Sequence, residues 1–150
     1  MNWNSAIKEY CDYLKIEKGL AENSVKAYKR DLQKLALYCE DKNYLPLKMD
    51  LNRLESAVVY LSESGISANS QARFISSLKG FYNYLILEDY CSNNPADLLN
   101  APRLSRKLPI YLEEEEIATM INSVDLSKPE GMRNKAILET LYGCGLRVSE

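Results

Sequence analysis

The chain has 150 residues, a formal net charge of -2 and an apolar content of 46%, which is enough to bury a core in one ordinary domain or two small ones. It has no apolar run long enough to cross a membrane, and its opening residues lack the pattern of a signal peptide, so we expect a cytoplasmic protein with no membrane contact. The sequence contains no histidine, which excludes Ser-His and Cys-His nucleophiles and histidine acid-base catalysis within these residues.

The first two predicted helices are indicated by apolar residues that recur every three or four positions. One covers about residues 3–18, and Gly19 follows as a stop signal. The next has an apolar stripe over residues 25–39, with Asn23 or Ser24 available to cap its first amide groups.

Two further helices are predicted before residue 90. Asp50 is a candidate cap for one of them, and Gly65 is the expected end. The other begins near Ser67 or Asn69 and has a long apolar line over residues 74–85.

The next segment, "NNPADLLN" at residues 93–100, predicts a short helix with Asn94 as its cap and Pro95 at its first position. Residues 101–109, "APRLSRKLP", carry three positive charges without helical periodicity and are interpreted as a linker. Amphipathic patterns then predict helices over 113–124 and 130–142. No segment has a convincing strand pattern, so the expected class is all-α.

The four cysteines stand far apart and form no C-x-x-C pair. Without histidine they do not match the ligand spacing of a zinc site, and we expect no metal. Each of the four is expected to be a reduced residue, with Cys11 and Cys39 at predicted core positions.

Positive charge is separated from negative charge along the chain. Residues 64–87 contain only two charged side chains, Arg73 and Lys79. The second stretch without acids, residues 98–112, contains Arg103, Arg106 and Lys107. This distribution matters more for a polyanionic partner than the net charge does.

Two predicted helices carry polar faces opposite their apolar stripes, because residues three and four apart are neighbours on a helix surface. The face of the second helix contains Lys26, Lys29, Arg30 and Gln33. The face of the fourth contains Asn69, Arg73, Ser76, Ser77 and Gly80. Short side chains beside an arginine allow close approach to a DNA groove. An ordinary solvated face is the alternative.

The chain ends with "LYGCGLRVSE", in which Gly143 and Gly145 are expected to end a helix. The G-x-G follows a helix and lacks a third glycine, so it is no dinucleotide fingerprint. Arg147 lies just beyond the turn, where a helix is expected to start again and where an arginine is well placed to bind a phosphate through two parallel hydrogen bonds. A surface or capping arginine is the alternative.

Four ordered stretches resemble the tyrosine-type site-specific recombinases, or phage integrase family, and within it the Xer recombinases. The matching stretches are "EKGLAENSVKAYKRDL" (17–32), "SQARFISSLKGFYNYL" (70–85), "NNPADLLNAPRLSRKLP" (93–109) and "MRNKAILETLYGCGLRVSE" (132–150). The resemblance implies a four- to five-helix SAM-like core-binding domain over 1–100, a basic linker over 101–109 and the N-terminal fragment of a catalytic domain over 110–150.

By this resemblance Arg147 is the first catalytic arginine and contacts the scissile phosphate, with Glu150 as structural support. Gly143 and Cys144 depart from the Ala and Thr that close relatives often carry, which implies altered local packing but the same role for the arginine. The residues expected to contact DNA are Lys26, Lys29, Arg30, Asn69, Arg73, Lys79, Arg103, Arg106 and Lys107. We therefore predict that Arg73→Ala weakens DNA binding more than Lys42→Ala.

The resemblance also implies chemistry in which a tyrosine attacks the DNA backbone and forms a 3′-phosphotyrosyl link. Because the link stores the energy of the broken bond, neither ATP, a metal nor another cofactor is needed. The tyrosine and the remaining catalytic groups of the family lie downstream of its first arginine. We therefore expect the 150-residue chain to bind double-stranded DNA and to be inactive alone.

The implied function is DNA recombination, such as resolution of chromosome dimers before partition. Family members act as tetramers of recombinase subunits on DNA, whereas this piece is expected to be a monomer in solution. Two alternatives stay open. In the first, the parent protein is an integrase of a mobile element with the same chemistry. In the second, the chain is a helical protein-interaction module without DNA binding.

Overall fold

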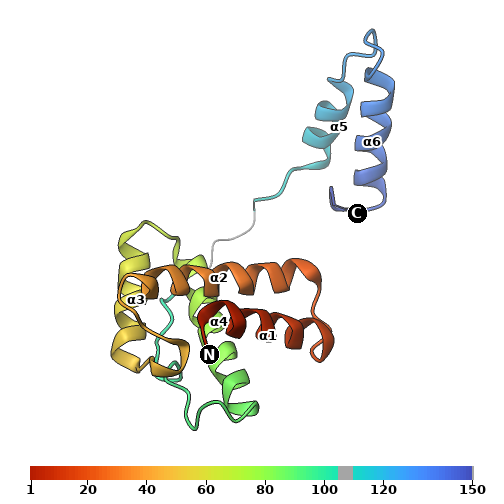
Figure 1. The fold of residues 1–150 in the computed structure, drawn as a ribbon. Helices are drawn as coiled ribbons and strands as arrows, with labels where there is room; N and C mark the ends of the chain where they lie inside the picture. The colour runs from red at the N-terminus through yellow and green to blue at the C-terminus, as the bar shows by residue number, and fades with distance from the viewer. Residues whose placement is uncertain (105–109, 150) are drawn as a thin grey trace. The chain divides into compact units, whose positions relative to one another are not determined.

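The computed structural model describes residues 1–104 and 110–149. Over these ranges the structure contains six α-helices and one 3₁₀ helix and no strand (Figure 1), which confirms the predicted all-α class. None of the helices in the described ranges is long and apolar enough to span a bilayer. The chain divides into two compact units, Met1–Ser105 and Arg106–Glu150, which are described separately below.

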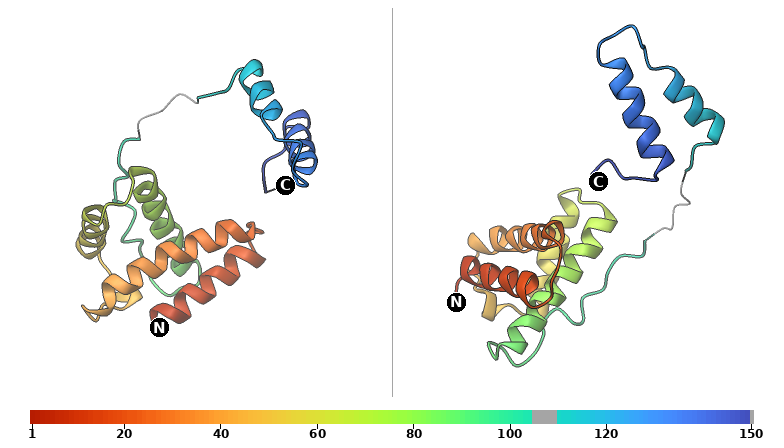
Figure 2. Two further views of the ribbon diagram at one scale, coloured as in Figure 1. Left: turned by 90° about the horizontal axis from the view of Figure 1, so that it is seen from above. Right: turned by 90° about the vertical axis from the view of Figure 1, so that its right-hand side faces the viewer.

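The first unit begins with two antiparallel helices, α1 (Trp3–Ile16) and α2 (Glu22–Glu40), that lie side by side in every view (Figures 1 and 2). The Asn2 side chain caps α1 by accepting the Ser5 N–H at 2.8 Å. The helix ends two residues earlier than predicted, because the chain already turns before Gly19, which adopts a left-handed φ of 60°.

Helices α3 (Leu51–Glu63) and α4 (Ala68–Leu87) complete this unit, and a 3₁₀ helix, η1 (Pro46–Lys48), precedes α3. Asp50 caps α3 as predicted, since its carboxylate accepts the Arg53 N–H at 2.9 Å. Ser67 rather than Asn69 caps α4, through its hydroxyl and the Ser70 N–H. Helix α4 packs against both α2 and α3.

The core of the first unit lies where α4 crosses α1 and α2. Phe81 of α4 is fully buried, and its ring centroid lies 6.0 Å from that of Trp3 and 5.5 Å from that of Tyr10. A Cβ atom on Gly80 would come within 2.6 Å of the Tyr10 hydroxyl oxygen. Glycine at this position therefore leaves room for the Tyr10 hydroxyl.

The prediction of a short helix at residues 93–100 is wrong, because this segment forms turns. The Asp97 and Leu99 amides each bond a carbonyl three residues back, in the manner of a turn. Asn94 does cap the segment, since its side-chain oxygen accepts the Ala96 N–H at 2.8 Å. These amide hydrogen bonds span three residues rather than the four of an α-helix, so the segment forms turns and not a helix.

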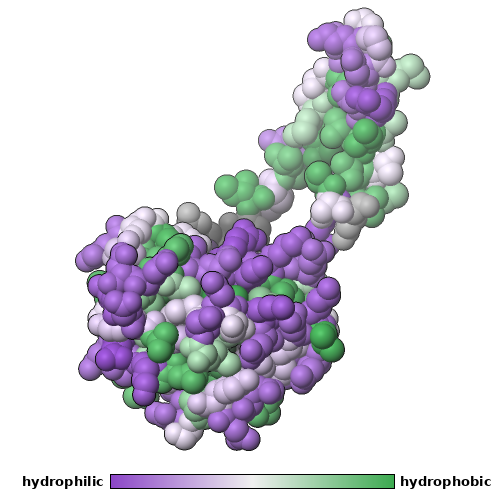
Figure 3. All heavy atoms as spheres, in the orientation of Figure 1, coloured by the Kyte–Doolittle hydropathy of each residue, from purple (hydrophilic) through white to green (hydrophobic). Residues whose placement is uncertain are grey.

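The second unit is a pair of helices, α5 (Glu114–Asn122) and α6 (Gly131–Gly143). Glu113 and Glu116 form a reciprocal capping box at the start of α5. Among its described residues only Gly131 is buried, and many apolar side chains are exposed on the visible face (Figure 3). A Cβ on Gly131 would overlap the Asp125 carbonyl oxygen, so the turn between the helices requires glycine.

Candidate nucleic-acid interface

The polar face predicted on α2 lies exposed to solvent. Lys26, Lys29 and Arg30 are all exposed, on the side of the helix opposite Leu32 and Leu35 of the core. Lys26 pairs with Glu22 at 2.7 Å, and the Arg30 Nε–H donates to the Lys26 carbonyl oxygen at 3.3 Å. This pairing with Lys26 holds the pKa of the Glu22 carboxyl below its usual value.

The face predicted on α4 is narrower than the sequence indicated. Asn69, Arg73 and Ser76 are exposed, but Ser77 is fully buried and Gly80 packs against α1. The reason is hydrogen bonding, since the Ser77 hydroxyl donates inward to an acidic side chain of α2. The assignment of Ser77 and Gly80 to a surface that meets DNA is therefore corrected.

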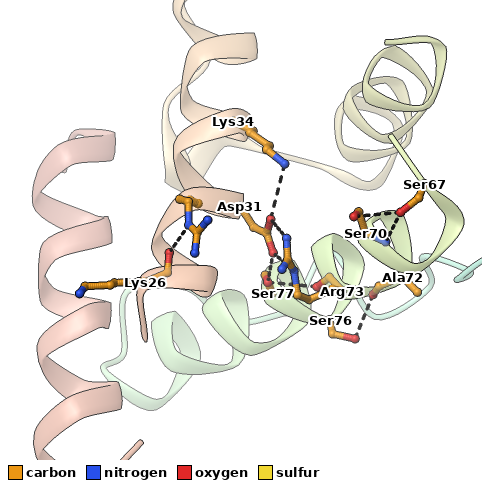
Figure 4. Close-up of polar contacts among 10 residues, drawn as sticks. Lys26, Asp31, Lys34, Ser67, Ser70, Ala72, Arg73, Ser76 and Ser77 are labelled. Carbon is orange, nitrogen blue, oxygen red and sulfur yellow. Dashed lines mark hydrogen bonds and ion pairs between the residues drawn. The ribbon is translucent and has the colours of Figure 1, made fainter. Parts of the chain in front are cut away.

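That acidic side chain is Asp31, the central residue of a polar cluster between α2 and α4 (Figure 4). Its side chain is 0% exposed. The Arg73 Nε–H donates to Asp31 Oδ2 at 3.0 Å and the Nη2–H donates to Oδ1 at 3.1 Å. The Ser77 hydroxyl donates to Oδ2 at 3.0 Å, and the Lys34 ammonium lies 3.9 Å from Oδ1.

The sequence analysis did not identify Asp31 as a site residue. A signal was available, because Asp31 follows Tyr28 by three positions and precedes Leu35 by four, which places a carboxylate within the apolar stripe. A charged residue inside such a stripe requires a partner that hydrogen-bonds its buried charge. The fork-shaped guanidinium of Arg73 is that partner, and half of the Arg73 side chain stays exposed.

Lys79 and Arg103 lie at different places in the first unit. The Lys79 ammonium donates to the Asp97 carbonyl oxygen at 3.0 Å, which ties α4 to the turn that follows it. Arg103 is exposed beyond this turn. Arg106 and Lys107, the other two predicted linker contacts, lie outside the described residues.

Arg147 is exposed and follows the left-handed turn at Gly145, whose φ is 63°. The predicted helix-ending role is correct for Gly145, whereas Gly143 is the last residue of α6. Residues 148–149 form a turn rather than the fresh helix start that the sequence predicted. Glu150 lies outside the described residues.

Burial keeps the thiols of Cys11 and Cys39 protonated. Cys11, Cys39, Cys91 and Cys144 are free cysteines. Burial raises the pKa of the Cys39 thiol to about 11 and also raises that of Cys11. Both of these thiols therefore stay protonated near neutral pH.

Comparison with known proteins relates the chain to DNA recombinases. The family described as "Phage integrase, N-terminal SAM-like domain" matches residues 7–89, more than half of the chain. A tyrosine recombinase XerD from Staphylococcus haemolyticus is 38% identical over 145 residues, covering 96% of this chain and 49% of the relative. XerD proteins of Staphylococcus epidermidis (36% over 148 residues) and Staphylococcus aureus (37% over 145 residues) cover 98% and 96% of this chain and 50% and 49% of the relatives.

The chain thus spans about half the length of the curated relatives it matches. The segment 7–89 contains α2, α3 and α4 and most of α1, and so includes the Asp31 cluster and both exposed faces. The chain belongs to the phage integrase family, with the SAM-like N-terminal domain at residues 7–89 and XerD tyrosine recombinases among its relatives.

Proposed function

We propose that the chain is the DNA-binding part of a tyrosine site-specific recombinase, which breaks and rejoins DNA through a 3′-phosphotyrosyl intermediate. The observation that carries this proposal is the exposed cationic face of α2, formed by Lys26, Lys29 and Arg30, in a domain of the phage integrase family. The name "tyrosine recombinase" of its relatives supports the reaction class.

On this proposal the α2 face neutralises phosphates along one groove of the duplex. Each cation that replaces a condensed counterion adds to the salt dependence of binding. Asn69 and Arg73 on α4 extend the same contact, because α4 packs against α2 and both side chains are exposed. An amide and a guanidinium are groups that contact base edges and phosphates.

We place the remaining cations along the DNA backbone. Lys79 uses one donor for the Asp97 carbonyl oxygen and keeps two N–H groups for a phosphate oxygen. By resemblance to other family members, the linker crosses the duplex, and its Arg103, Arg106 and Lys107 contact the DNA backbone.

We assign residues 110–150 to the beginning of the catalytic domain and Arg147 to the scissile phosphate. Removal of a donor that stabilises charge in a transition state typically raises the activation barrier by about 2.7–4 kcal/mol, which slows the reaction. The tyrosine nucleophile of the family lies downstream of this arginine. The 150-residue chain should therefore bind DNA without cutting it and should need no cofactor.

We propose a Xer-like biological role in resolving joined chromosomes, which places the protein in the cytoplasm with the DNA. The full-length protein would act with other recombinase subunits as a tetramer on DNA. The 150-residue chain is proposed to be a monomer in solution, since the family's tail that links subunits lies further downstream.

Fluorescence anisotropy with a labelled mixed-sequence duplex tests this function. We expect binding at low salt, with log K falling linearly as log salt rises, because phosphate contacts release counterions. A denaturing gel should show no covalent protein-DNA adduct. Absence of binding at low salt, or binding that is indifferent to salt, would contradict the proposal and favour a protein-interaction module.

A further inference from the structure

The Asp31 carboxylate leaves part of the Arg73 guanidinium unused. A guanidinium has five N–H donors, and the Nε–H and one Nη2–H bond the carboxylate. Three N–H donors of Arg73, two on Nη1 and one on Nη2, are not used by Asp31. Half of the side chain is exposed, so Arg73 joins a buried anion to the surface beside the α2 face.

We propose that Asp31 is a positioning residue for DNA binding. It holds Arg73 in one orientation, so that the unused N–H groups meet a phosphate oxygen of the duplex without further ordering. Long side chains normally lose rotamer freedom when they bind. Here that freedom is already lost on folding, because two parallel hydrogen bonds and full burial fix the carboxylate end of the pair.

The second consequence concerns the two helices. Asp31 lies on α2 directly after Arg30, and its partners Arg73 and Ser77 lie on α4. The cluster therefore fixes the spacing between the cationic face of α2 and Asn69 and Arg73 on α4. A rigid spacing favours contact with phosphates at fixed positions on a duplex.

Positioning and simple electrostatics predict opposite results for Asp31→Asn. Removing a negative charge next to a DNA-binding face should by charge alone strengthen binding to a polyanion. An amide, however, presents N–H groups to the Arg73 fork and cannot accept both of its hydrogen bonds. If Asp31 positions Arg73, the variant binds more weakly although it is more positive.

The inference rests on the proposed DNA binding, and the experiment separates the two. The full 150-residue chain is titrated into a fluorescein-labelled mixed-sequence duplex at low salt, at a temperature where circular dichroism shows each variant folded. Glu22→Gln is the matched control, because it makes the same charge change at an exposed carboxylate of α2. We expect Asp31→Asn to weaken binding roughly tenfold and Glu22→Gln to leave it equal or tighter.

A double substitution tests the route through Arg73. In an Arg73→Gln background, Asp31→Asn should not weaken binding further, because the group that it positions is already gone and only the gain in positive charge remains. A purely structural role would lower affinity equally in both backgrounds. That result would overturn the inference.

Wild-type protein provides a readout that does not depend on the variants folding. The Nε–H resonance of Arg73, assigned by its loss in Arg73→Lys, should be visible and should shift when duplex is added. Wild-type protein that binds no duplex would overturn the proposed function and this inference with it. If wild-type protein binds duplex but the Arg73 resonance does not move, this inference alone is overturned. The same holds if wild-type protein binds duplex and Asp31→Asn binds as tightly as Glu22→Gln.

Discussion

Asp31 is a charged residue in a hydrophobic core, and its partners decide whether it is tolerated there. An isolated buried carboxylate is strongly unfavourable, whereas one that accepts several hydrogen bonds is not. Arg73 supplies two of these bonds and Ser77 a third. The cluster should therefore be sensitive to removal of its largest partner.

Arg73→Ala should lower the free energy of unfolding by about 2–3 kcal/mol, less than for a wholly buried pair because Arg73 is half exposed. Urea unfolding followed by circular dichroism measures the change. Arg30→Ala is the matched control on the neighbouring helix, where the exposed Arg30 side chain donates a hydrogen bond to the Lys26 carbonyl oxygen. Equal midpoints for the two variants would show that Asp31 does not depend on Arg73.

Among the elements, the loop between α5 and α6 depends on a single glycine. Gly131 is buried at the start of α6, where a Cβ would overlap the Asp125 carbonyl oxygen. Gly143, at the end of the same helix, has no atom near its Cβ position. The two glycines provide a matched pair for testing this unit.

Gly131→Ala should loosen the helix pair, and Gly143→Ala should leave it intact or stabilise it, because alanine favours helix where space allows. Amide hydrogen exchange within α6 measures both effects. Faster exchange is expected for the first variant and unchanged or slower exchange for the second. Equal exchange in the two variants would mean that the loop can rearrange around a methyl group.

The packing of α1 against α4 involves three tyrosines, of which Tyr10 and Tyr84 are buried and Tyr13 is partly buried. The ring centroids of Tyr13 and Tyr84 lie 4.8 Å apart, and those of Tyr10 and Tyr84 lie 5.4 Å apart. Burial raises the pKa of Tyr84 to about 12 from an ordinary value of 10.0, with nearby Glu88 adding to the effect. Burial also raises the pKa of Tyr10.

The first unit should lose stability in alkaline solution, between about pH 10 and pH 12. The folded state keeps the Tyr84 proton at a pH where the unfolded state releases it, so this contribution is complete below pH 10 and declines as pH rises through the folded pKa. Circular dichroism and tyrosinate absorbance follow the transition. Tyr84→Phe should weaken this dependence, whereas Tyr111→Phe, at a tyrosine that is 77% exposed, should not. Identical pH profiles for both variants would contradict the assignment.

The helices were predictable because each has a strong local signal. Asp50 and Gly65 bracket α3, and the apolar stripes of α2 and α4 locate the core. What sequence reasoning missed depends on contacts between helices. From sequence alone Ser77 is assigned to a polar face, but in the structure its hydroxyl bonds Asp31 on the facing helix. Gly80 is assigned to a surface that lets DNA approach, but in the structure it packs against Tyr10.

For the molecule as a whole, the net charge of -2 gives little indication of DNA binding. The charges are separated, with exposed cations on α2 and acidic residues at the start of α5. Local fields rather than the sum govern association with a polyanion. A test of DNA binding must therefore compare cations at different places and not only total charge.

The α2 face provides a cleaner test than Arg73 does, since Arg73→Ala also leaves a buried carboxylate without its main partner. Lys29 and Lys42 are both exposed lysines and give the same change of charge when replaced by alanine. Lys29 lies on the proposed face, whereas Lys42 follows the end of α2 and packs over the Tyr38 ring at 4.9 Å.

The salt dependence of duplex binding by Lys29→Ala and Lys42→Ala tests the DNA-binding proposal most directly. Lys29→Ala should lower the affinity and flatten the slope of log K against log salt by about 0.9, the effect of one lost phosphate contact. Lys42→Ala should keep the wild-type slope. Equal slopes and equal affinities for the two variants would contradict the assignment of the α2 face to DNA.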